Sequence, residues 1–245
     1  MNDKKRFGLI GRNISYSFSK KFFEEKFRAL QLPNHTYDIF DLPEMESLPE
    51  LLKTKNLRGL NVTIPYKEKI IPYLDQLSDE AAAIGAVNTI SITENRTVGY
   101  NTDAYGFEKT LFKHKKAHQN SALVLGDGGA AKAVKHILQK HGIPFETVSR
   151  SGKLTFENLT ANDVCNHLII IQCTPVGTFP NVNEFVPFPF ESLSTNHLVI
   201  DLIYNPPHTC FLKKAAQQSA TVVNGSYMLE QQAEKAAEIW NIQKK

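Results

Sequence analysis

The segment from Asn61 to Lys67 brings amide, hydroxyl and ammonium groups into one short stretch of chain. Asn61 and Thr63 are two residues apart, so their side chains point to the same side of an extended strand. Pro65 fixes a turn, and the pattern after it predicts a helix that starts near Lys67. An ammonium group at a helix N-terminus opposes the macrodipole and costs stability unless a carboxylate compensates for it. Such a local conflict is typical of functional residues, so Lys67 is a candidate.

Two further loops are rich in small polar residues. One contains Ser15, Ser17 and Ser19, and the other contains Asn101 and Asp103. Serine and aspartate are also favoured helix N-caps, and capping alone would explain both loops. The residues by themselves leave capping and binding open.

A glycine-rich turn lies between a predicted strand and a predicted helix. The apolar run Ala122–Leu125 leads into Gly126, and a helical segment follows. Gly126 permits a tight turn, Gly128 lets the backbone approach a pyrophosphate, and Ala131 lets the helix pack on the strand. The helix N-terminus would offer N–H groups to phosphates. A dinucleotide site is the favoured interpretation, and a plain strand-to-helix turn is the alternative.

The end of the next predicted strand distinguishes between the two nicotinamide cofactors. NAD sites place an Asp or Glu about 20 residues after the glycines to bind the ribose 2′-hydroxyl. This chain has Ser149, Arg150 and Ser151 there. A cation flanked by hydroxyls favours the 2′-phosphate of NADP, although Arg150 could also be an ordinary surface residue.

The elements that must position these residues alternate between strand and helix. In the first half we expect strands at Arg6–Ile10, Thr36–Phe40 and Gly59–Val62, and helices at Ser19–Leu30, Leu48–Lys55 and Pro65–Leu77. Ala86–Ile92 and Thr97–Tyr100 are expected to pair around a turn at Glu94 and Asn95.

A second alternating series follows the basic run Lys113–Lys116. We expect strands at Ala122–Leu125, Phe145–Val148, Leu168–Gln172 and Leu198–Asp201, with a helix at Ala130–His141. The proline-rich stretch Val176–Pro189 is expected to be a loop. Strands that alternate with helices indicate an α/β fold with parallel βαβ units, and we place a domain boundary near residue 103. A last helix, Tyr227–Gln243, has an apolar stripe that could pack on either domain.

Composition limits the classes of protein that remain. A chain of 245 residues has room for one large or two small domains. Hydrophobic residues make up 42% and charged residues 22%, which excludes disordered, collagenous and coiled-coil chains. A net charge of +3 is too mild to predict nucleic-acid binding. No apolar run is long enough to cross a membrane and no signal peptide is evident, so we expect a cytoplasmic protein.

The three cysteines, Cys165, Cys173 and Cys210, include no CxxC pair. Neither a disulfide framework nor a zinc site is therefore predicted, and no metal is expected.

The chain resembles the shikimate dehydrogenase family over nearly its whole length. The matching segments, in order, are Ser17-Phe-Ser19, Asn61–Lys67, Gly85-Ala-Val-Asn-Thr89, Asn101-Thr-Asp103, Gly126–Ala130, Ser149-Arg150, Cys173-Thr-Pro-Val-Gly177, Asp201–Tyr204 with Pro206 and Thr209, and Asn224–Leu229 with Gln232. Each motif alone is short, and their order together is specific.

The resemblance implies two α/β domains with a cleft between them. An N-terminal domain over residues 1–103, joined by the C-terminal helix 227–245, would bind shikimate, and a Rossmann-like domain over residues 104–226 would bind NADP. Lys67 and Asp103 would form the acid/base pair. The substrate would be surrounded by Ser17, Ser19, Asn61, Thr63, Asn88, Tyr204 and Gln232, and the cofactor by Gly126, Gly128, Gly129, Ala130, Ser149, Arg150, Thr174, Gly225 and Met228.

The chain departs from the family pattern at four positions. Tyr16 stands where His is more common, and Lys20 where Pro often follows the second serine. Asp127 replaces a small residue in the glycine-rich turn, and Gln172 replaces an Asn. The last two differences bear on cofactor affinity.

The resemblance implies reversible reduction of 3-dehydroshikimate to shikimate, in the route to aromatic amino acids. A quinate/shikimate dehydrogenase that uses NAD is the alternative enzyme, and Arg150 disfavours it. A non-catalytic nucleotide sensor is the alternative from another class, and the presence of both Lys67 and Asp103 argues against it. The expected partners are small molecules only, with no nucleic acid or membrane, and the protein is expected to be a monomer or homodimer.

Overall fold

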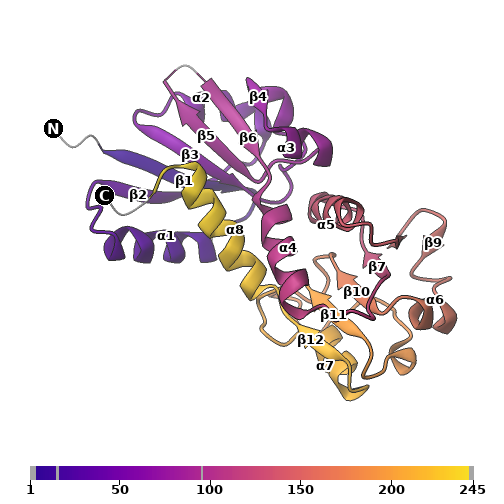
Figure 1. The fold of residues 1–245 in the computed structure, drawn as a ribbon. Coiled ribbons are helices and arrows are strands. Elements are labelled where there is room, and N and C mark those ends of the chain that lie inside the picture. The colour runs from indigo at the N-terminus through magenta and orange to yellow at the C-terminus, as the bar shows by residue number, and fades with distance from the viewer. Residues whose placement is uncertain (1–3, 15–16, 95, 243–245) are drawn as a thin grey trace. The chain divides into compact units, whose positions relative to one another are not determined.

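A computed structural model describes residues 4–14, 17–94 and 96–242 (Figure 1). The chain forms two compact units, Met1–Thr102 with Gln232–Lys245 and Asp103–Gln231. Of the expectations above, those on Ser15, Tyr16, Asn95 and residues 243–245 fall outside the described residues.

The first unit contains a six-stranded mixed sheet within the described residues. Its strands are β1 (Lys5–Gly11), β2 (His35–Asp41), β3 (Leu57–Val62), β4 (Gln76–Leu77), β5 (Thr89–Thr93) and β6 (Arg96–Tyr100), in the order β2-β1-β3-β5-β6-β4. β1 runs parallel to β2 and β3, whereas β5 is antiparallel to both β3 and β6. The expected strands and the β5–β6 pairing are confirmed, although β5 begins three residues later than expected.

The helices of the first unit differ more from the expectation. They are α1 (Phe18–Ala29), α2 (Leu48–Leu52) and α3 (Asp79–Ile84), with single 3₁₀ turns η1 (Met45–Ser47) and η2 (Ile71–Tyr73). The helix expected over Pro65–Leu77 is wrong: residues 64–70 form turns and only η2 is helical. Pro72 has no N–H to donate to a carbonyl in the preceding turn, which prevents a continuous helix through residues 65–77.

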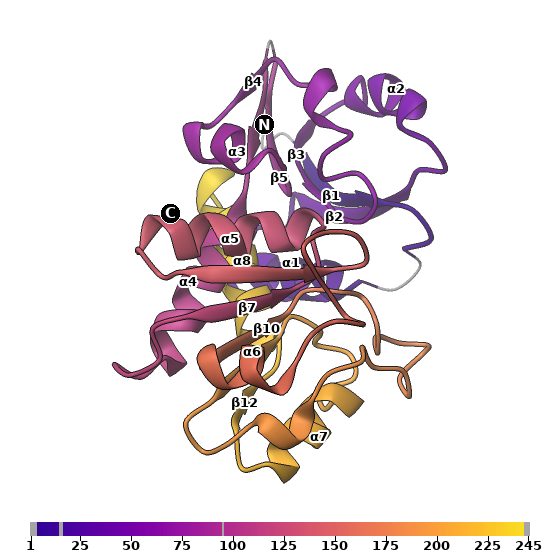
Figure 2. The same ribbon diagram turned by 90° about the vertical axis from the view of Figure 1, so that its right-hand side faces the viewer.

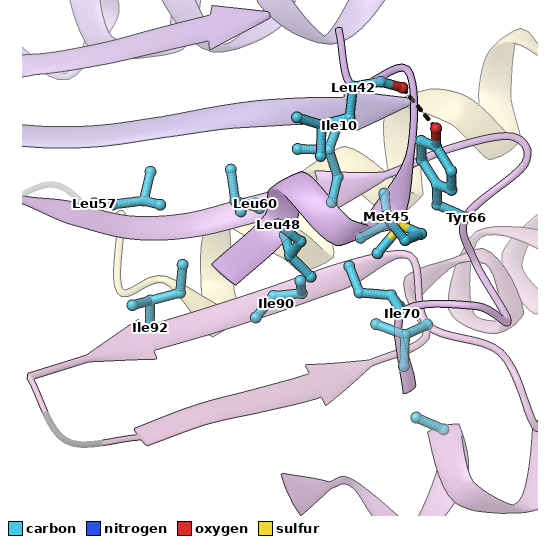
Figure 3. Close-up of a cluster of buried hydrophobic side chains, with 13 residues drawn as sticks. Ile10, Leu42, Met45, Leu48, Leu57, Leu60, Tyr66, Ile70, Ile90 and Ile92 are labelled. Carbon is cyan, nitrogen blue, oxygen red and sulfur yellow. Dashed lines mark hydrogen bonds between the residues drawn. The ribbon is translucent and has the colours of Figure 1, made fainter. Parts of the chain in front are cut away.

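Both faces of the first sheet are covered by apolar side chains. Figure 3 shows the cluster on one face, in which residues of η1 and α2 pack against the strands. There the Tyr66 hydroxyl donates to the Leu42 carbonyl at 2.6 Å. The other face packs against α1 and the C-terminal end of α8 (Ser226–Ile239). On that side the Trp240 indole occupies the space beside Gly59 and donates to the Ile90 carbonyl at 2.9 Å.

The second unit contains a six-stranded parallel sheet within the described residues. Its strands are β7 (Ala122–Leu125), β8 (Phe145–Ser149), β9 (Leu154–Thr155), β10 (Ile169–Gln172), β11 (Leu198–Asp201) and β12 (Thr221–Val223), in the order β12-β11-β10-β7-β8-β9. β7 lies between β8 and β10, where the chain changes its direction of travel across the sheet. Ligands of open α/β sheets bind outside the carboxyl ends of the strands at such a switch point.

Helices cover both faces of this second sheet. They are α4 (Thr102–His114), α5 (Gly129–Lys140), α6 (Ala161–Asn166) and α7 (Cys210–Gln217), with one 3₁₀ turn, η3 (Phe190–Ser192). α6 and α7 pack in one cluster with β7, β10 and β11, and Figure 2 shows α5 on the opposite side of the strands. The four long strands, α5 and the Val176–Pro189 loop match the expectation. α6 and α7 were not expected, and α4 was anticipated only by the capping interpretation of Asp103, without a residue range.

The described residues contain no helix that is long and apolar enough to cross a membrane. They also contain no group of three or more His, Cys, Asp or Glu side chains that could hold a metal ion.

Candidate active site

The start of α1 presents hydroxyl groups and backbone N–H groups. Ser17 is the N-cap, and its Oγ accepts from the Ser19 N–H at 3.1 Å. The cap uses only a lone pair, so the Ser17 hydroxyl proton remains able to donate. The first turn contains no acidic residue, which leaves the positive end of the helix dipole uncompensated and favours an anion there. The capping role of Ser17 is thus confirmed and is compatible with binding a carboxylate.

Asn61 lies near the end of β3 and is 4% exposed. Its Oδ1 accepts from the Tyr37 hydroxyl at 2.7 Å, and its Nδ2 donates to Thr89 Oγ1 at 3.1 Å and to the Asn88 carbonyl at 3.4 Å. The antiparallel register pairs Asn61 with Thr89, which brings these two side chains together. The Asn61 amide is therefore held from both neighbouring strands.

Asn88 is the centre of a second buried group. Its Nδ2 donates to Thr102 Oγ1 at 3.0 Å and to Gln232 Oε1 at 3.4 Å, and its Oδ1 accepts from the Thr102 N–H at 2.6 Å. Thr89 Oγ1 also lies 3.2 Å from Thr102 Oγ1, which links this group to Asn61. Asn88 and Gln232 are 3% and 8% exposed, so these amides are removed from bulk water and have defined orientations.

Thr63 and Lys67 follow β3 in the turn segment. The Thr63 N–H donates to the Ile10 carbonyl at 2.9 Å and the Lys67 carbonyl accepts from the Val87 N–H at 2.7 Å, so the backbone is anchored on both sides of Pro65. The Ile64–Pro65 peptide is cis. Lys67 is half-buried and does not begin a helix, so the predicted conflict with a helix dipole is wrong.

Asp103 and Tyr204 belong to the second unit. Asp103 is the second residue of α4 and is 6% exposed, whereas Tyr204 follows β11 and is half-buried. The capping interpretation of Asp103 is wrong, because α4 already begins at Thr102. A carboxylate in this first turn is stabilised by the helix dipole.

The glycine-rich turn after β7 has the backbone geometry that a pyrophosphate needs. Gly126 has φ +113°, where a side chain would be strained, and Gly128 is the N-cap of α5 with no side-chain cap. A Cβ at Gly128 would meet no atom within 4 Å, so the approach to the first turn of α5, which begins with Gly129 and Ala130, is open. Asp127 is exposed, and α5 contains no acidic residue in its first turn. These residues fit the diphosphate of a dinucleotide.

The loops after the parallel strands leave the sheet at the same edge. Leu125 pairs with Val148 of β8 and with Gln172 of β10, and Gln172 pairs with Asp201 of β11. The glycine-rich turn and the residues after β8 therefore begin side by side. Ser149 is 6% exposed and its Oγ donates to the Ser151 carbonyl at 2.6 Å, which fixes the bend that presents the exposed Arg150.

Thr174 lies beside the glycine-rich turn, since a Cβ on Gly126 would come within 3.1 Å of Thr174 Cγ2. The Gln172 side chain holds this loop: its Oε1 accepts from the Thr174 N–H at 2.5 Å and its Nε2 donates to the Thr174 carbonyl at 3.1 Å. Between them, burial raises the pKa of the Cys173 thiol, and the nearby Asp201 carboxylate adds to that effect.

Gly225 and Met228 lie before and within the first turns of α8. A Cβ on Gly225 would overlap the Leu202 carbonyl, so only glycine allows this close approach of two backbones. The Gly225 N–H donates to the Ile203 carbonyl at 3.0 Å, and Met228 is 6% exposed.

Within the first unit the structure thus joins Asn61, Asn88 and Gln232 in one hydrogen-bond network. Three residues of this network were missed as functional candidates: Tyr37, Thr89 and Thr102. Thr89 and Thr102 lie inside motifs that carried the family resemblance, whereas Tyr37 had no signal beyond its place in a predicted strand.

Comparison with known proteins decides the family. The chain is 40% identical over 248 residues to "Shikimate dehydrogenase (NADP(+))" of Clostridium beijerinckii, an alignment that covers 96% of this chain and 91% of the relative. The chain belongs to the shikimate dehydrogenase family. A family model described as the shikimate dehydrogenase substrate binding domain matches residues 9–90.

Solved structures of the family have the same fold. Shikimate dehydrogenase from Aquifex aeolicus superposes with a TM-score of 0.88 at 32% identity, covering 99% of this chain and 94% of that one. The Thermus thermophilus enzyme, solved in complex with NADP(H) and shikimate, gives a TM-score of 0.87 at 31% identity and covers 98% and 94% of the two chains. The expected family and α/β fold class are both confirmed.

Proposed function

We propose that this protein is an NADP-dependent shikimate dehydrogenase that catalyses the reversible reduction of 3-dehydroshikimate to shikimate, on the route to chorismate and the aromatic amino acids. The observation that carries the proposal is the buried network of neutral amides and hydroxyls around Asn61 and Asn88, in a chain that belongs to this family. Neutral hydrogen-bonding groups with fixed orientation suit a ligand that carries several hydroxyl groups.

On the substrate side, Ser17 and Ser19 bind the carboxylate at the N-terminus of α1. Hydroxyl donors and the helix dipole stabilise this anion without a buried cation. Asn61, Thr63, Asn88, Tyr204 and Gln232 bind the ring hydroxyls. This division of work agrees with the absence of acidic residues from the first turn of α1.

On the cofactor side, the backbone N–H groups at the start of α5 bind the diphosphate, and Arg150 binds the 2′-phosphate of the adenosine ribose. Ser149 and Thr174 shape the two flanking loops, and Gly225 and Met228 complete the site. NADPH, when bound, supplies the hydride that adds to the substrate C3 carbonyl carbon.

Lys67 acts as the proton donor to the carbonyl oxygen during reduction. Negative charge develops on that oxygen as the carbon is reduced, so a positioned ammonium group stabilises the transition state more than the ground state. Asp103 accepts a hydrogen bond from a substrate hydroxyl and forms the acid/base pair with Lys67. In the oxidation direction neutral Lys67 takes the hydroxyl proton.

The proposal also divides the chain into two domains: residues 1–103 with 227–245 hold most of the shikimate-binding residues, and residues 104–226 hold most of the NADP-binding residues. A cytoplasmic location belongs to it as well, supported by three free cysteines, the state that a reducing compartment maintains. The protein is expected to be either a monomer or a homodimer, and light scattering after size-exclusion chromatography distinguishes the two.

A direct test follows the absorbance of the reduced cofactor while shikimate and quinate are each combined with NADP and NAD. The proposal predicts the highest kcat/KM for shikimate with NADP. Higher kcat/KM with quinate and NAD would favour the alternative dehydrogenase. Dinucleotide binding without turnover of either acid would favour the sensor.

A further inference from the structure

Tyr37 occupies an unusual place in the first unit, because its polar end meets two candidate substrate-binding residues. It lies on β2, is 2% exposed, and its ring stacks on Phe23 of α1 with centroids 4.7 Å apart and planes 8° apart. Its hydroxyl donates to Asn61 Oδ1 at 2.7 Å. It also lies close enough to the Ser19 side chain for that hydroxyl to affect its pKa. Stacking fixes the ring, and the ring then fixes where the hydroxyl points.

The hydrogen bonds of Asn61 define the orientation of its amide. Nδ2 has two protons, and the two acceptors next to it are Thr89 Oγ1 and the Asn88 carbonyl. A flipped amide would place Asn61 Oδ1 against the Asn88 carbonyl, two acceptors with no proton between them. The donor from Tyr37 to Oδ1 selects the same orientation from the opposite side.

These hydrogen bonds also determine what Asn61 can offer to a ligand. Both Nδ2 protons and one lone pair of Oδ1 are engaged within the described part of the chain, which leaves the second lone pair of Oδ1. Asn61 would therefore accept a hydrogen bond from a substrate hydroxyl. Without the Tyr37 donor, Asn61 Oδ1 loses its hydrogen bond within the protein, and its orientation toward the substrate hydroxyl is less well defined.

We propose that Tyr37 is a positioning residue for substrate binding: its hydroxyl, held by the stack on Phe23, orients the Asn61 amide so that Oδ1 accepts from a hydroxyl of shikimate. This inference rests on the proposed function and adds a residue to it that does not itself touch the substrate.

The protonation state of the Tyr37 hydroxyl does not change across the working pH range of the enzyme. Burial raises the pKa of Tyr37 well above its usual value, and the Ser19 hydroxyl opposes this only in part. The phenol therefore remains protonated and keeps donating. Any pH dependence of substrate binding comes from other groups.

The test is the Tyr37→Phe variant, which removes the hydroxyl and keeps the ring. We expect the KM for shikimate to rise about 5- to 10-fold, the size of one neutral buried hydrogen bond. The kcat and the KM for NADP should stay within about twofold of wild type, because an interaction made equally in the ground and transition states affects KM alone. A merely structural loss would lower the active fraction, and hence the apparent kcat, without changing KM.

Tyr66→Phe is the matched control. Tyr66 is 1% exposed and lies in the same unit, and its hydroxyl also donates to a single strong acceptor, the Leu42 carbonyl, at 2.6 Å. That acceptor is not a candidate substrate-binding group. We expect a comparable decrease in melting temperature for both variants, and an increased shikimate KM only for Tyr37→Phe.

A double-mutant cycle identifies the route of the effect. If Tyr37 acts through Asn61, Tyr37→Phe should change the shikimate KM less than about twofold in an Asn61→Ala background, because the residue that it orients is gone. An equal increase in both backgrounds would show that Tyr37 acts elsewhere and overturn the inference.

Failure of the inference and failure of the proposed function give different results. Active wild-type enzyme with an unchanged KM in Tyr37→Phe overturns the positioning role alone. Wild-type protein that does not oxidise shikimate with NADP overturns the proposed function, and the positioning role with it.

Discussion

Asp201, at the end of β11, gives the second unit a stability that depends on pH. Its Oδ2 accepts from the Thr209 hydroxyl at 2.6 Å and its Oδ1 accepts from the Ile203 N–H at 3.0 Å. The side chain is fully buried. Burial raises the pKa of Asp201 from 3.8 to about 6, and these two hydrogen bonds limit the increase.

The sign of the effect follows from proton binding in the two states. Between about pH 4 and pH 6 the folded state retains the proton on Asp201 and the unfolded state has lost it, so unfolding releases a proton. The free energy of unfolding must then fall as the pH rises through this window. Each pH unit contributes about 1.4 kcal/mol, so a pKa that folding raises from 3.8 to about 6 gives a loss of about 3 kcal/mol between low pH and neutral pH.

Asp201→Asn removes this titration and nearly keeps the shape. We expect the stability of the wild type relative to Asp201→Asn to decrease by up to about 3 kcal/mol from about pH 4 to about pH 7, and to be constant at higher pH. Urea unfolding followed by circular dichroism at a series of pH values measures the difference. A stability difference that does not change with pH would refute the reasoning.

Asp163→Asn is the control for this series. Hydrogen bonds from the Thr160 side chain and backbone lower the pKa of Asp163, the reverse of Asp201. Its stabilising effect is therefore complete above its ordinary pKa and is lost only at more acid pH. The free energy of unfolding of wild type relative to Asp163→Asn should therefore stay constant between about pH 4 and pH 7. Over the same range, that of wild type relative to Asp201→Asn decreases.

Three further predictions concern the candidate site. Lys67→Ala should lower kcat by about 10²- to 10⁴-fold with little change in the KM for shikimate, and near-normal turnover would exclude Lys67 as the proton donor. Arg150→Ala should weaken the binding of NADP by about one to two decades and leave the affinity for NAD nearly unchanged in a binding titration, because only NADP has the 2′-phosphate. Equal losses of affinity for the two cofactors would point to a structural role. Asp127→Ala should tighten NADP severalfold, and less at high salt, because the exposed carboxylate repels the phosphates across water. Since the N-cap of α5 is Gly128, the same variant should melt as the wild type does, and weaker NADP binding would contradict the repulsion.

Local sequence was sufficient where neighbouring residues decide the conformation. The buried strand β7, the glycine-rich turn and α5 follow one another within about 20 residues, and each is specified by its own apolar spacing and by Gly126 and Gly128. The same applies to β5 and β6, which are close in the sequence and pair antiparallel. Family motifs then identified most of the candidate site residues.

Local sequence was insufficient where packing competes with propensity. The turn segment around Lys67 has helical spacing, yet its prolines and its backbone bonds to β1 and to Val87 hold it in turns. No residue range was predicted for α4, although Ala104, Phe107 and Leu111 lie at helical spacing, because the polar residues at its start were interpreted as a domain boundary.

The network that orients Asn61 and Asn88 was decided by tertiary structure alone. Tyr37 lies 24 residues from Asn61, and Asn88 lies 144 residues from Gln232. Such bonds depend on the order of strands in the sheet and on the return of α8 to the first unit, neither of which is encoded in the spacing of nearby residues. The sequence thus determined which groups were available for chemistry, and the sheet decided which of them are held in one orientation. The reason is that a hydrogen bond needs its donor and acceptor within about 3 Å, a distance that the spacing of residues along the chain does not specify.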